Sequence, residues 1–162
     1  GLSTRRGKAG QEMSLFNPAN TLERLRERQR GTMVEFLGIE LVELGADFLR
    51  GTMPVTERSI QPMRIQHGGA NVAFAETLAS VATAATLDID RYAALGQEIN
   101  ANHLRPAPLG SKLDAITRPF HVGRRSQVWG IEISNERGQL VCVARITMAI
   151  VEREPGRPGG LG

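Results

Sequence analysis

The sequence predicts an α+β domain in which one long central helix is wrapped by an antiparallel sheet of five or six strands. Between Arg64 and Asp88 there is one formally charged residue, Glu76, and its neighbours are small or apolar. Alanine has the strongest helix propensity and the run is much longer than a strand, so we expect a buried helix that begins just after His67-Gly68-Gly69. Four long strand-like runs follow with tight turns between them, which favours an antiparallel sheet in mostly meander order.

The other elements are predicted from turn residues and apolar periodicity. Asn20 or Thr21 is expected to cap a short amphipathic helix that runs through Arg30 and ends at Gly31. Residues 56–66 lack periodicity and are expected to form the loop before the long helix. The predicted strands are Phe36–Glu43, Asp47–Pro54, Ala94–Arg105, Lys112–Val122, Ser126–Asn135 and Gln139–Val151.

A chain of 162 residues is long enough for one hydrophobic core but not for two. We expect this single domain to span residues 18–152. Residues 1–17 and 153–162 are polar, contain glycine and arginine, and lack periodicity, so both are predicted to be disordered tails.

The charge distribution argues against a nucleic-acid partner. The formal net charge is +3, but residues 1–30 hold seven Lys and Arg against three Asp and Glu, and the remaining 132 residues hold thirteen against fourteen. The basic excess is therefore terminal and does not form a groove on the domain. One Trp and one Tyr also leave little aromatic surface for stacking on bases.

The long apolar run and the single cysteine bear on the cellular location. The run around Glu76 is about long enough to span a bilayer, but Ala, Gly and Thr insert poorly and a central carboxylate adds to the cost, so no membrane association is expected. The lone Cys142 rules out an internal disulfide and lies within the alternating run 140–150. We therefore expect a buried, inert thiol and a cytoplasmic protein.

Several common catalytic constellations are missing from the sequence. His67, His103 and His121 lack the spacing of zinc ligands, and we find no dinucleotide fingerprint, phosphate-binding loop or nucleophilic serine elbow. We expect neither a metal nor a cofactor.

The remaining candidates are Gln61, His67-Gly68-Gly69 and Glu76. Glycines at a helix start leave backbone N–H groups that can face an oxyanion, and a Glu two turns further along can act as nucleophile or base, which is the minimum for acyl transfer or hydrolysis. Glu76, Ser80 and Thr83 also share one helix face. Structural alternatives stay open: a tight turn at the glycines, a hydrogen-bonded His67, and a structurally paired Glu76.

A second candidate is the segment His121–Ser126 between two predicted strands. Its glycine turn is flanked by Arg124, Arg125 and Ser126, which offer charge and a hydroxyl donor to a phosphate. Arg105 and Arg118 are expected on neighbouring strands. A solvated basic turn explains the segment equally well.

Three segments resemble the hotdog-fold acyl-CoA thioesterases of the PaaI-like superfamily: QHGGANVAFAETLAS, GQEINANHLRPA and RPFHVGRRSQVWGIEISNERGQLVCVARITMAI. Over roughly residues 33–151 the chain is most similar to the branch that holds 1,4-dihydroxy-2-naphthoyl-CoA hydrolase and the Glu-dependent 4-hydroxybenzoyl-CoA thioesterase. Glu, rather than Asp, at position 76 favours this branch over the phenylacetyl-CoA thioesterases. The resemblance implies a hotdog fold, hydrolysis of an aromatic acyl-CoA to free acid and coenzyme A, and homodimers that pair into tetramers with the site at the dimer interface.

The resemblance also implies roles for individual residues. Glu76 matches the catalytic carboxylate, acting as nucleophile or as base on water, and the Gly68 N–H matches the group that polarises the thioester carbonyl. Gln61 and His67 match residues that orient the thioester, and Ser80 matches a hydroxyl that places the attacking group. The implied coenzyme A contacts are His103, Arg105, His121, Val122, Gly123, Arg124, Arg125 and Ser126. Two departures, at residues 63–66 and in the basic Arg124-Arg125 pair, leave this chemistry intact.

Two other functions are weighed against hydrolysis. A hydratase or dehydratase of the same fold needs a His or Asp poised for α-proton chemistry where Glu76 stands. A non-catalytic acyl-CoA sensor would use the basic segment 5–30 to contact DNA, but its predicted helix at residues 22–30 is too short to serve as a recognition helix.

Overall fold

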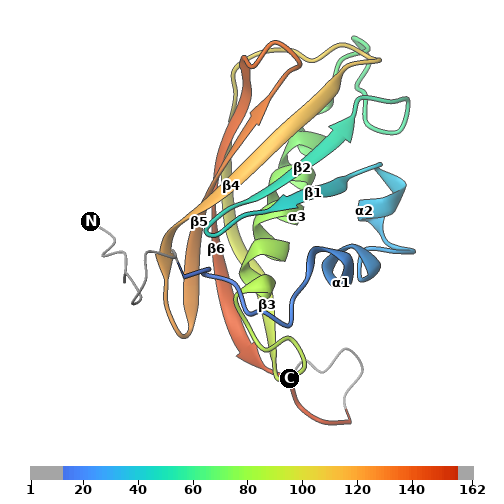
Figure 1. Ribbon diagram of the computed structural model, residues 1–162. Coiled ribbons are helices and arrows are strands. Elements are labelled where there is room, and N and C mark those ends of the chain that lie inside the picture. Colours follow the sequence, from blue (N-terminus) through green and yellow to red (C-terminus); the bar gives the residue numbers. More distant parts are fainter. Residues whose placement is uncertain (1–12, 157–162) are drawn as a thin grey trace.

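The long helix α3 (Gly68–Ala85) lies across one face of a six-stranded antiparallel sheet (Figure 1). The computed structural model describes residues 13–156. Alanines dominate the buried face of α3, so the sheet approaches the helix axis closely and curves around it. The predicted hotdog architecture is confirmed. The residues of α3 with no exposed surface are Phe74, Ala75, Leu78, Ala79, Ala82, Thr83 and Ala85.

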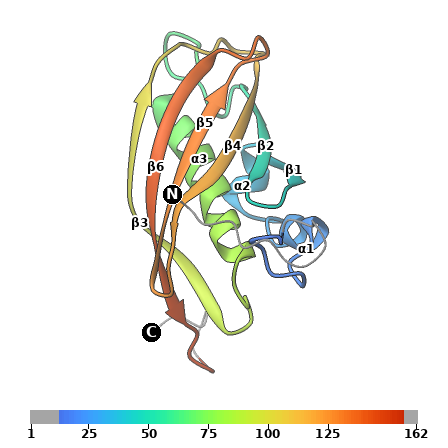
Figure 2. The same cartoon turned by 60° about the vertical axis from the view of Figure 1, so that its left-hand side comes forward.

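The sheet order is β1-β2-β4-β5-β6-β3. The meander from β4 to β6 is as predicted, but β3 pairs with β6 at the far edge and not with β4. After β3 the proline-containing segment 104–111 passes over the end of the sheet to reach β4 (Figure 2), so Arg105 and Arg118 are not on neighbouring strands. The strands are β1 (Glu40–Leu44), β2 (Leu49–Pro54), β3 (Tyr92–His103), β4 (Lys112–Val122), β5 (Ser126–Ser134) and β6 (Leu140–Glu152).

The two edges of the sheet differ in how far they are protected. At β1, which is five residues long and bulged, Arg26 Nε donates a hydrogen bond of 2.8 Å to the carbonyl of Leu41. The opposite edge, β3, is twelve residues long, and within residues 13–156 its backbone makes no hydrogen bond on the outer side between Ala93 and His103. A long unpaired edge is a template for pairing with another chain.

The elements before the sheet differ from the prediction in their boundaries. α1 (Leu22–Glu27) ends before Arg30, and Thr21 is its N-cap. The expected strand at Phe36–Glu43 is wrong in its first half, because Thr32 caps a further short helix, α2 (Met33–Phe36), and the strand begins only at Glu40. The Thr32 hydroxyl caps the start of this helix, and this local hydrogen bond favours the helix over the extended conformation that the prediction assumed.

Asn20 is not a helix N-cap and instead closes the C-terminal end of α3. Its amide nitrogen donates to the carbonyls of Ala84, Ala85 and Leu87 at 3.4, 2.9 and 2.7 Å. Carbonyls in the last turn of a helix have no partner within the helix, so this buried side chain supplies one. The contact also fixes α1 beside the end of α3.

The folded domain extends beyond residues 18–152 at both ends. Phe16 is 5% exposed and stacks on the buried Trp129 with ring centroids 6.4 Å apart, so the predicted tail 1–17 is wrong for its last residues. Residues 1–12 and 157–162 lie outside the described residues. At the other end, the Arg153 N–H donates to the carbonyl of Arg91. No helix between residues 13 and 156 has the length and apolar character of a membrane span.

We expect Asn20→Ala to lower the free energy of unfolding by about 1–3 kcal/mol, because buried carbonyls lose their donor. Asn20→Asp, which has the same shape but no donor, should cost at least as much, since its charge would face the negative end of α3. Chemical denaturation at one fixed protein concentration, followed by circular dichroism, measures both. A wild-type denaturation midpoint in the two variants would contradict the role of Asn20.

Candidate active site

Glu76 stands on the half-buried face of α3, beside the open edge of the sheet. Its carboxylate lies against Gly96 of β3, so closely that a Cβ at Gly96 would be 2.4 Å from Glu76 Oε1. The strand bulges immediately after Gly96, where the pairing of β3 with β6 shifts, and bulges are common beside functional sites. Within residues 13–156 the Glu76 carboxylate has no hydrogen bond and no ion pair. Within one described chain, Glu76 therefore has no structural partner of the kind that the alternative interpretation requires.

The two polar neighbours of Glu76 on α3 have different environments. Ser80, one turn further along, is half-buried and lines a groove between α1, α3 and the start of β3. Thr83 is fully buried, and its hydroxyl donates to the carbonyl of Ala79 at 2.8 Å. Thr83 shares the helix face of Glu76 but not its access to solvent.

The first turn of α3 leaves the Gly68 N–H without an acceptor. His67 is the N-cap: its Nδ1 accepts from the N–H of Gly69 at 2.8 Å, and its carbonyl accepts from Ala70 and Asn71. The alternative of a hydrogen-bonded helix-start His67 is thus what the structure has. Among the described residues no atom accepts from the Gly68 N–H. A free N–H at a helix N-terminus is suited to a developing negative charge.

The ring of His103 covers Gly68. A Cβ on Gly68 would be 2.9 Å from His103 Nε2, so only glycine leaves this space. Asn71 Nδ2 lies 3.2 Å from His103 Nδ1, within hydrogen-bond distance. Asn71 is 4% exposed and its Oδ1 has no partner in the described chain. Sequence reasoning missed Asn71, although its position three residues after Gly68 places it near the same end of α3.

Gln61 belongs to a tight turn. Its side-chain oxygen accepts from the N–H of Met63, its own N–H donates to the carbonyl of Ile65, and Arg64 has a positive φ of 60°. Arg64 also pairs with Glu57 at 2.8 Å. No hydrogen bond within the described chain links Gln61 to Gly68 or Glu76.

Gly68 and Glu76 do not face one small pocket within a single chain. Eight residues separate them on α3, which is about 12 Å along the helix axis. A carbonyl group that accepts from the Gly68 N–H at about 3 Å is therefore out of reach of the same chain's Glu76. The two groups contact different parts of β3: Gly68 lies under His103, the last residue of the strand, and Glu76 lies against Gly96, seven residues earlier.

The residues expected at coenzyme A also divide into two groups. The hairpin residues 121–126 are level with Leu95, since Ser126 pairs with Ala149 and Ala149 pairs with Leu95. His103 lies eight residues further along β3, about 26 Å away. Arg105 follows it and donates to the carbonyl of Leu140 at 3.1 Å. The hairpin members are His121, Val122, Arg124 and Arg125, all exposed, with half-exposed Gly123 and Ser126.

A groove of about 300 Å³ runs beside Ser80, between α1, the C-terminal half of α3 and the start of β3. Its lining combines apolar side chains with polar ones. Two arginines line it together with Ser80, and no carboxylate does. The lining residues are Leu25, Arg28, Gln29, Ser80, Val81, Ala84, Ile89, Tyr92, Ala93, Ala94, Leu95 and Arg153.

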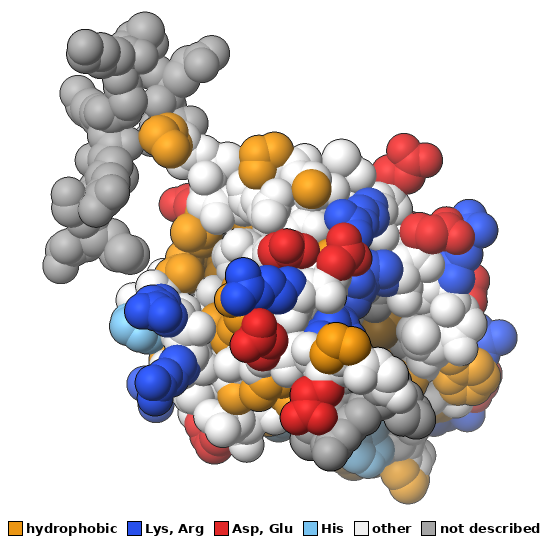
Figure 3. Space-filling model, turned by 90° about the horizontal axis from the view of Figure 1, so that it is seen from below, with side chains coloured by type: hydrophobic (Ala, Val, Ile, Leu, Met, Phe, Trp, Pro, Cys, Tyr) orange, Lys and Arg blue, Asp and Glu red, His pale blue; other side chains and the backbone are white. Residues whose placement is uncertain are grey.

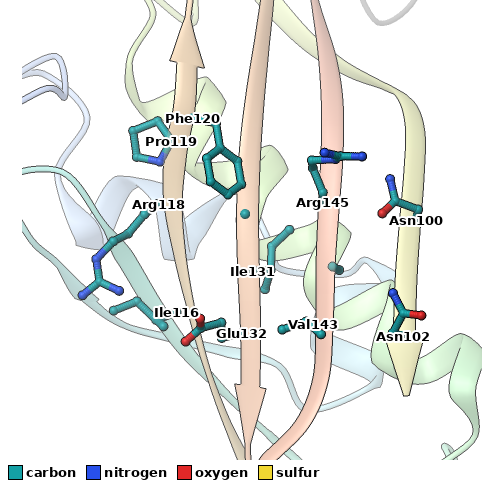
Figure 4. Close-up of a pocket in the computed structure, with 12 residues that line it drawn as sticks. Asn100, Asn102, Ile116, Arg118, Pro119, Phe120, Ile131, Glu132, Val143 and Arg145 are labelled. Atoms are coloured by element: carbon teal, nitrogen blue, oxygen red, sulfur yellow. The ribbon is translucent and has the colours of Figure 1, made fainter. Parts of the chain in front are cut away.

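A second hollow, of about 430 Å³, lies on the face of the sheet opposite α3 (Figure 4). Arg118 and Phe120 of β4, Glu132 of β5 and Arg145 of β6 stand around it, and α3 is seen behind the strands. Phe120 is 66% exposed. This outer face thus combines an exposed aromatic ring with charges of both signs.

Cys142 is fully buried in β6, and burial raises the pKa of its thiol. A protonated, inaccessible thiol is a poor nucleophile. Between residues 13 and 156, no three His, Cys, Asp or Glu side chains are grouped so as to hold a metal ion.

Comparison with known proteins supports the fold and thioester hydrolysis as the activity. Residues 63–142 match the family described as the thioesterase superfamily. The chain is 44% identical over 131 residues to 1,4-dihydroxy-2-naphthoyl-CoA hydrolase of Escherichia coli, covering 81% of this chain and 95% of that protein. It is also 44% identical to a proofreading thioesterase of Cronobacter turicensis, covering 81% and 94%. The crystal structure of a thioesterase from Haemophilus influenzae superposes with a TM-score of 0.82 at 40% identity, covering 88% of this chain and 99% of that one.

We expect Cys142 to be unreactive toward a thiol reagent such as dithionitrobenzoate in the native protein at pH 8, because its raised pKa keeps it protonated and the core excludes the reagent. It should react with one equivalent after denaturation in guanidinium, since the sequence holds one cysteine. An Arg137→Cys variant, exposed in the β5–β6 turn, provides the matched positive control. Rapid labelling of native Cys142 would show that the thiol is accessible.

Proposed function

The chain belongs to the thioesterase superfamily and is a thioester hydrolase; we propose that it hydrolyses an aromatic acyl-CoA to the free acid and coenzyme A. The aromatic acyl group is suggested by the similarity to 1,4-dihydroxy-2-naphthoyl-CoA hydrolase. The observation that carries the proposal is the unpaired Glu76 carboxylate, held against Gly96 at an open sheet edge. We also propose that the enzyme acts in the cytoplasm.

We propose that a second copy of the chain completes the site. In this dimer the β3 strands of two subunits would pair antiparallel, with the two-fold axis between Ile99 and Asn100. Gly96 and His103 lie equally far from this axis, on opposite sides of it. The axis would therefore set Gly96 of the partner subunit opposite His103. Since Glu76 contacts its own Gly96 and Gly68 contacts its own His103, the partner's Glu76 would then reach the Gly68 N–H. The 12 Å gap within one chain supports this arrangement.

The same symmetry would assemble the coenzyme A contacts. Reversal of β3 would bring the partner's hairpin 121–126 toward the end of β3 that carries His103 and Arg105. Arginines of that hairpin are suited to phosphate groups. We further propose that two such dimers associate through the outer sheet face around the exposed Phe120, which is a large unpaired apolar side chain.

The proposed reaction begins when the thioester carbonyl accepts a hydrogen bond from the Gly68 N–H at the positive end of α3. The partner's Glu76 attacks the carbonyl carbon, or removes a proton from a water molecule that attacks it. The tetrahedral oxyanion accepts from the Gly68 N–H, and its collapse breaks the C–S bond and releases coenzyme A as thiolate. Where water is the attacking group, this collapse gives the free acid directly. Where Glu76 is the attacking group, it leaves a mixed anhydride between the acyl group and Glu76, which water then hydrolyses to the free acid and the regenerated carboxylate. Gln61 and His67 would orient the thioester, and Ser80 would position the attacking group.

We expect Glu76→Gln to lower kcat by about a thousandfold, on the scale of a lost nucleophile or general base. Thiol release from benzoyl-CoA, a naphthoyl-CoA, phenylacetyl-CoA and a medium-chain acyl-CoA measures the loss. Glu23→Gln, an exposed carboxylate on α1, is the matched control and should keep the wild-type rate. Near-normal turnover by Glu76→Gln would exclude the mechanism. Tight binding of all four compounds without thiol release would favour an acyl-CoA sensor.

Complementation between two inactive variants tests the shared site. Gly68→Pro removes the critical N–H at the first position of α3, where the backbone accepts proline, and its ring would also displace His103 from the same half of the site. When this variant and Glu76→Gln are co-refolded in equal amounts, half of the dimers contain one chain of each kind. In such a dimer one of the two sites combines a normal Gly68 with a normal Glu76, and the other site has both substitutions. The mixture should therefore show about a quarter of the wild-type activity. If each site came from a single chain, every mixed dimer would stay inactive. Sedimentation analysis should find no monomer at micromolar concentration.

A further inference from the structure

We propose that this enzyme selects an aromatic acyl group that carries a second acidic group, a carboxylate, and that Arg28 binds it. The inference rests on the proposed function, since it assigns the acyl end of the substrate to the groove beside Ser80. That groove is about 300 Å³, at the lower end of the range for ligand pockets. A single ring fits this size better than a long acyl chain does.

The groove begins next to the reacting carboxylate. Leu95 lines it and precedes Gly96, which touches Glu76, and Ser80 lies one turn beyond Glu76 on α3. From there it follows α3 to Ala84, a further rise of about 6 Å. An acyl group whose carbonyl carbon is at Glu76 would therefore point along the groove toward α1 and Arg28.

Both apolar side chains and arginines line the groove. Leu25, Val81, Ile89 and Leu95 contribute apolar surface that suits an aromatic ring. Arg28 and Arg153 are the charged residues of the lining. The pKa of Arg28 is lowered, first by partial burial and then by the positive charges of Arg153 and Arg24.

Arg28 differs from Arg24, Arg26 and Arg30 in that its guanidinium has no partner among the described residues. Arg24 pairs with Asp90 at 3.2 Å, and Arg30 pairs with Glu27 at 3.2 Å. Arg26 donates to the carbonyl of Leu41. Among residues 13–156, the Arg28 guanidinium makes no hydrogen bond and no ion pair.

The lack of a partner is notable because acidic side chains are close by. Figure 3 shows basic and acidic side chains interspersed over the end of the molecule where α3 ends and β3 begins. Asp90 is engaged by Arg24, and Glu152 is engaged by Arg91. Arg28, an exposed side chain that lines the groove, is thus left without an ion pair among the described residues, and a guanidinium can bind a carboxylate through two parallel hydrogen bonds. The free acid released by the enzyme would be an aromatic dicarboxylate.

The decisive measurement compares two substrates of equal shape, 4-carboxybenzoyl-CoA and 4-carbamoylbenzoyl-CoA, which differ in the charge of the distal group. The wild-type enzyme should prefer the carboxylate, and Arg28→Met should lower the ratio of the two kcat/KM values by about 10- to 100-fold, as expected for a charged hydrogen bond. Arg28→Lys should recover part of the ratio. Arg30→Met, which removes the neighbouring charge outside the groove, should leave the ratio unchanged.

The outcomes separate this inference from the proposed function. Hydrolysis of both substrates with a ratio near one, or a ratio that Arg28→Met leaves intact, overturns the role of Arg28 while the thioesterase stands. An equal loss on both substrates overturns it as well, because Arg28 would then act on a part common to the two. If neither these compounds nor the simple aromatic and medium-chain acyl-CoAs release thiol, the proposed function itself fails.

Discussion

Close packing of α3 against β3 is the constraint on which the rest of the structure depends. The two elements run antiparallel and approach at two points where a Cβ is missing, Gly68 under the His103 ring and Gly96 under the Glu76 carboxylate. These contacts place the Gly68 N–H at the His103 end of β3 and the Glu76 carboxylate beside Gly96, and neither group has a partner within residues 13–156. Because a helix rises by about 1.5 Å per residue, one chain cannot apply both groups to one carbonyl. One chain therefore holds these two groups apart, and in the proposed dimer a two-fold axis across β3 would bring them together.

The edges of the sheet direct that association. β1 is short and bulged, and Arg26 occupies one of its outward carbonyls. β3 is long, and within the described chain its outer side has no backbone partner. An unprotected strand edge favours aggregation unless a specific partner covers it. Because β1 is protected and only β3 is open, pairing of two β3 edges leaves no further open edge, which favours closed dimers over open fibres. The bulge after Gly96 would also limit how far the pairing extends.

Local chemistry predicted much of the fold from the sequence. The alanine-rich run predicted α3, and alternation with turn residues predicted β4 at Lys112–Val122. Long-range contacts account for the errors. The place of β3 at the far edge depends on how α3 crosses the sheet, and Phe16 belongs to the core because it stacks on Trp129 far along the chain. For the same reason, sequence motifs identified the other candidate residues, whereas Asn71 and Arg28 can be identified only from the side chains that surround them in the folded chain.

Unpaired polar groups distinguish the candidate site more sharply than burial does. Gln127 is buried but saturated, since it donates to Thr86 and accepts from Trp129, both at 2.9 Å, and such a closed network stabilises a core. Asn71 Oδ1, the Gly68 N–H and the Glu76 carboxylate have no such partners within residues 13–156. Most buried polar groups in folded proteins are paired, and leaving one unpaired costs about 1–3 kcal/mol. Asn71 Oδ1 is the buried one of these three groups, and the other two are half-exposed. In the proposed dimer, a second subunit and a polarised thioester would satisfy these groups together, and their placement along α3 and β3 fits that proposal better than a structural role.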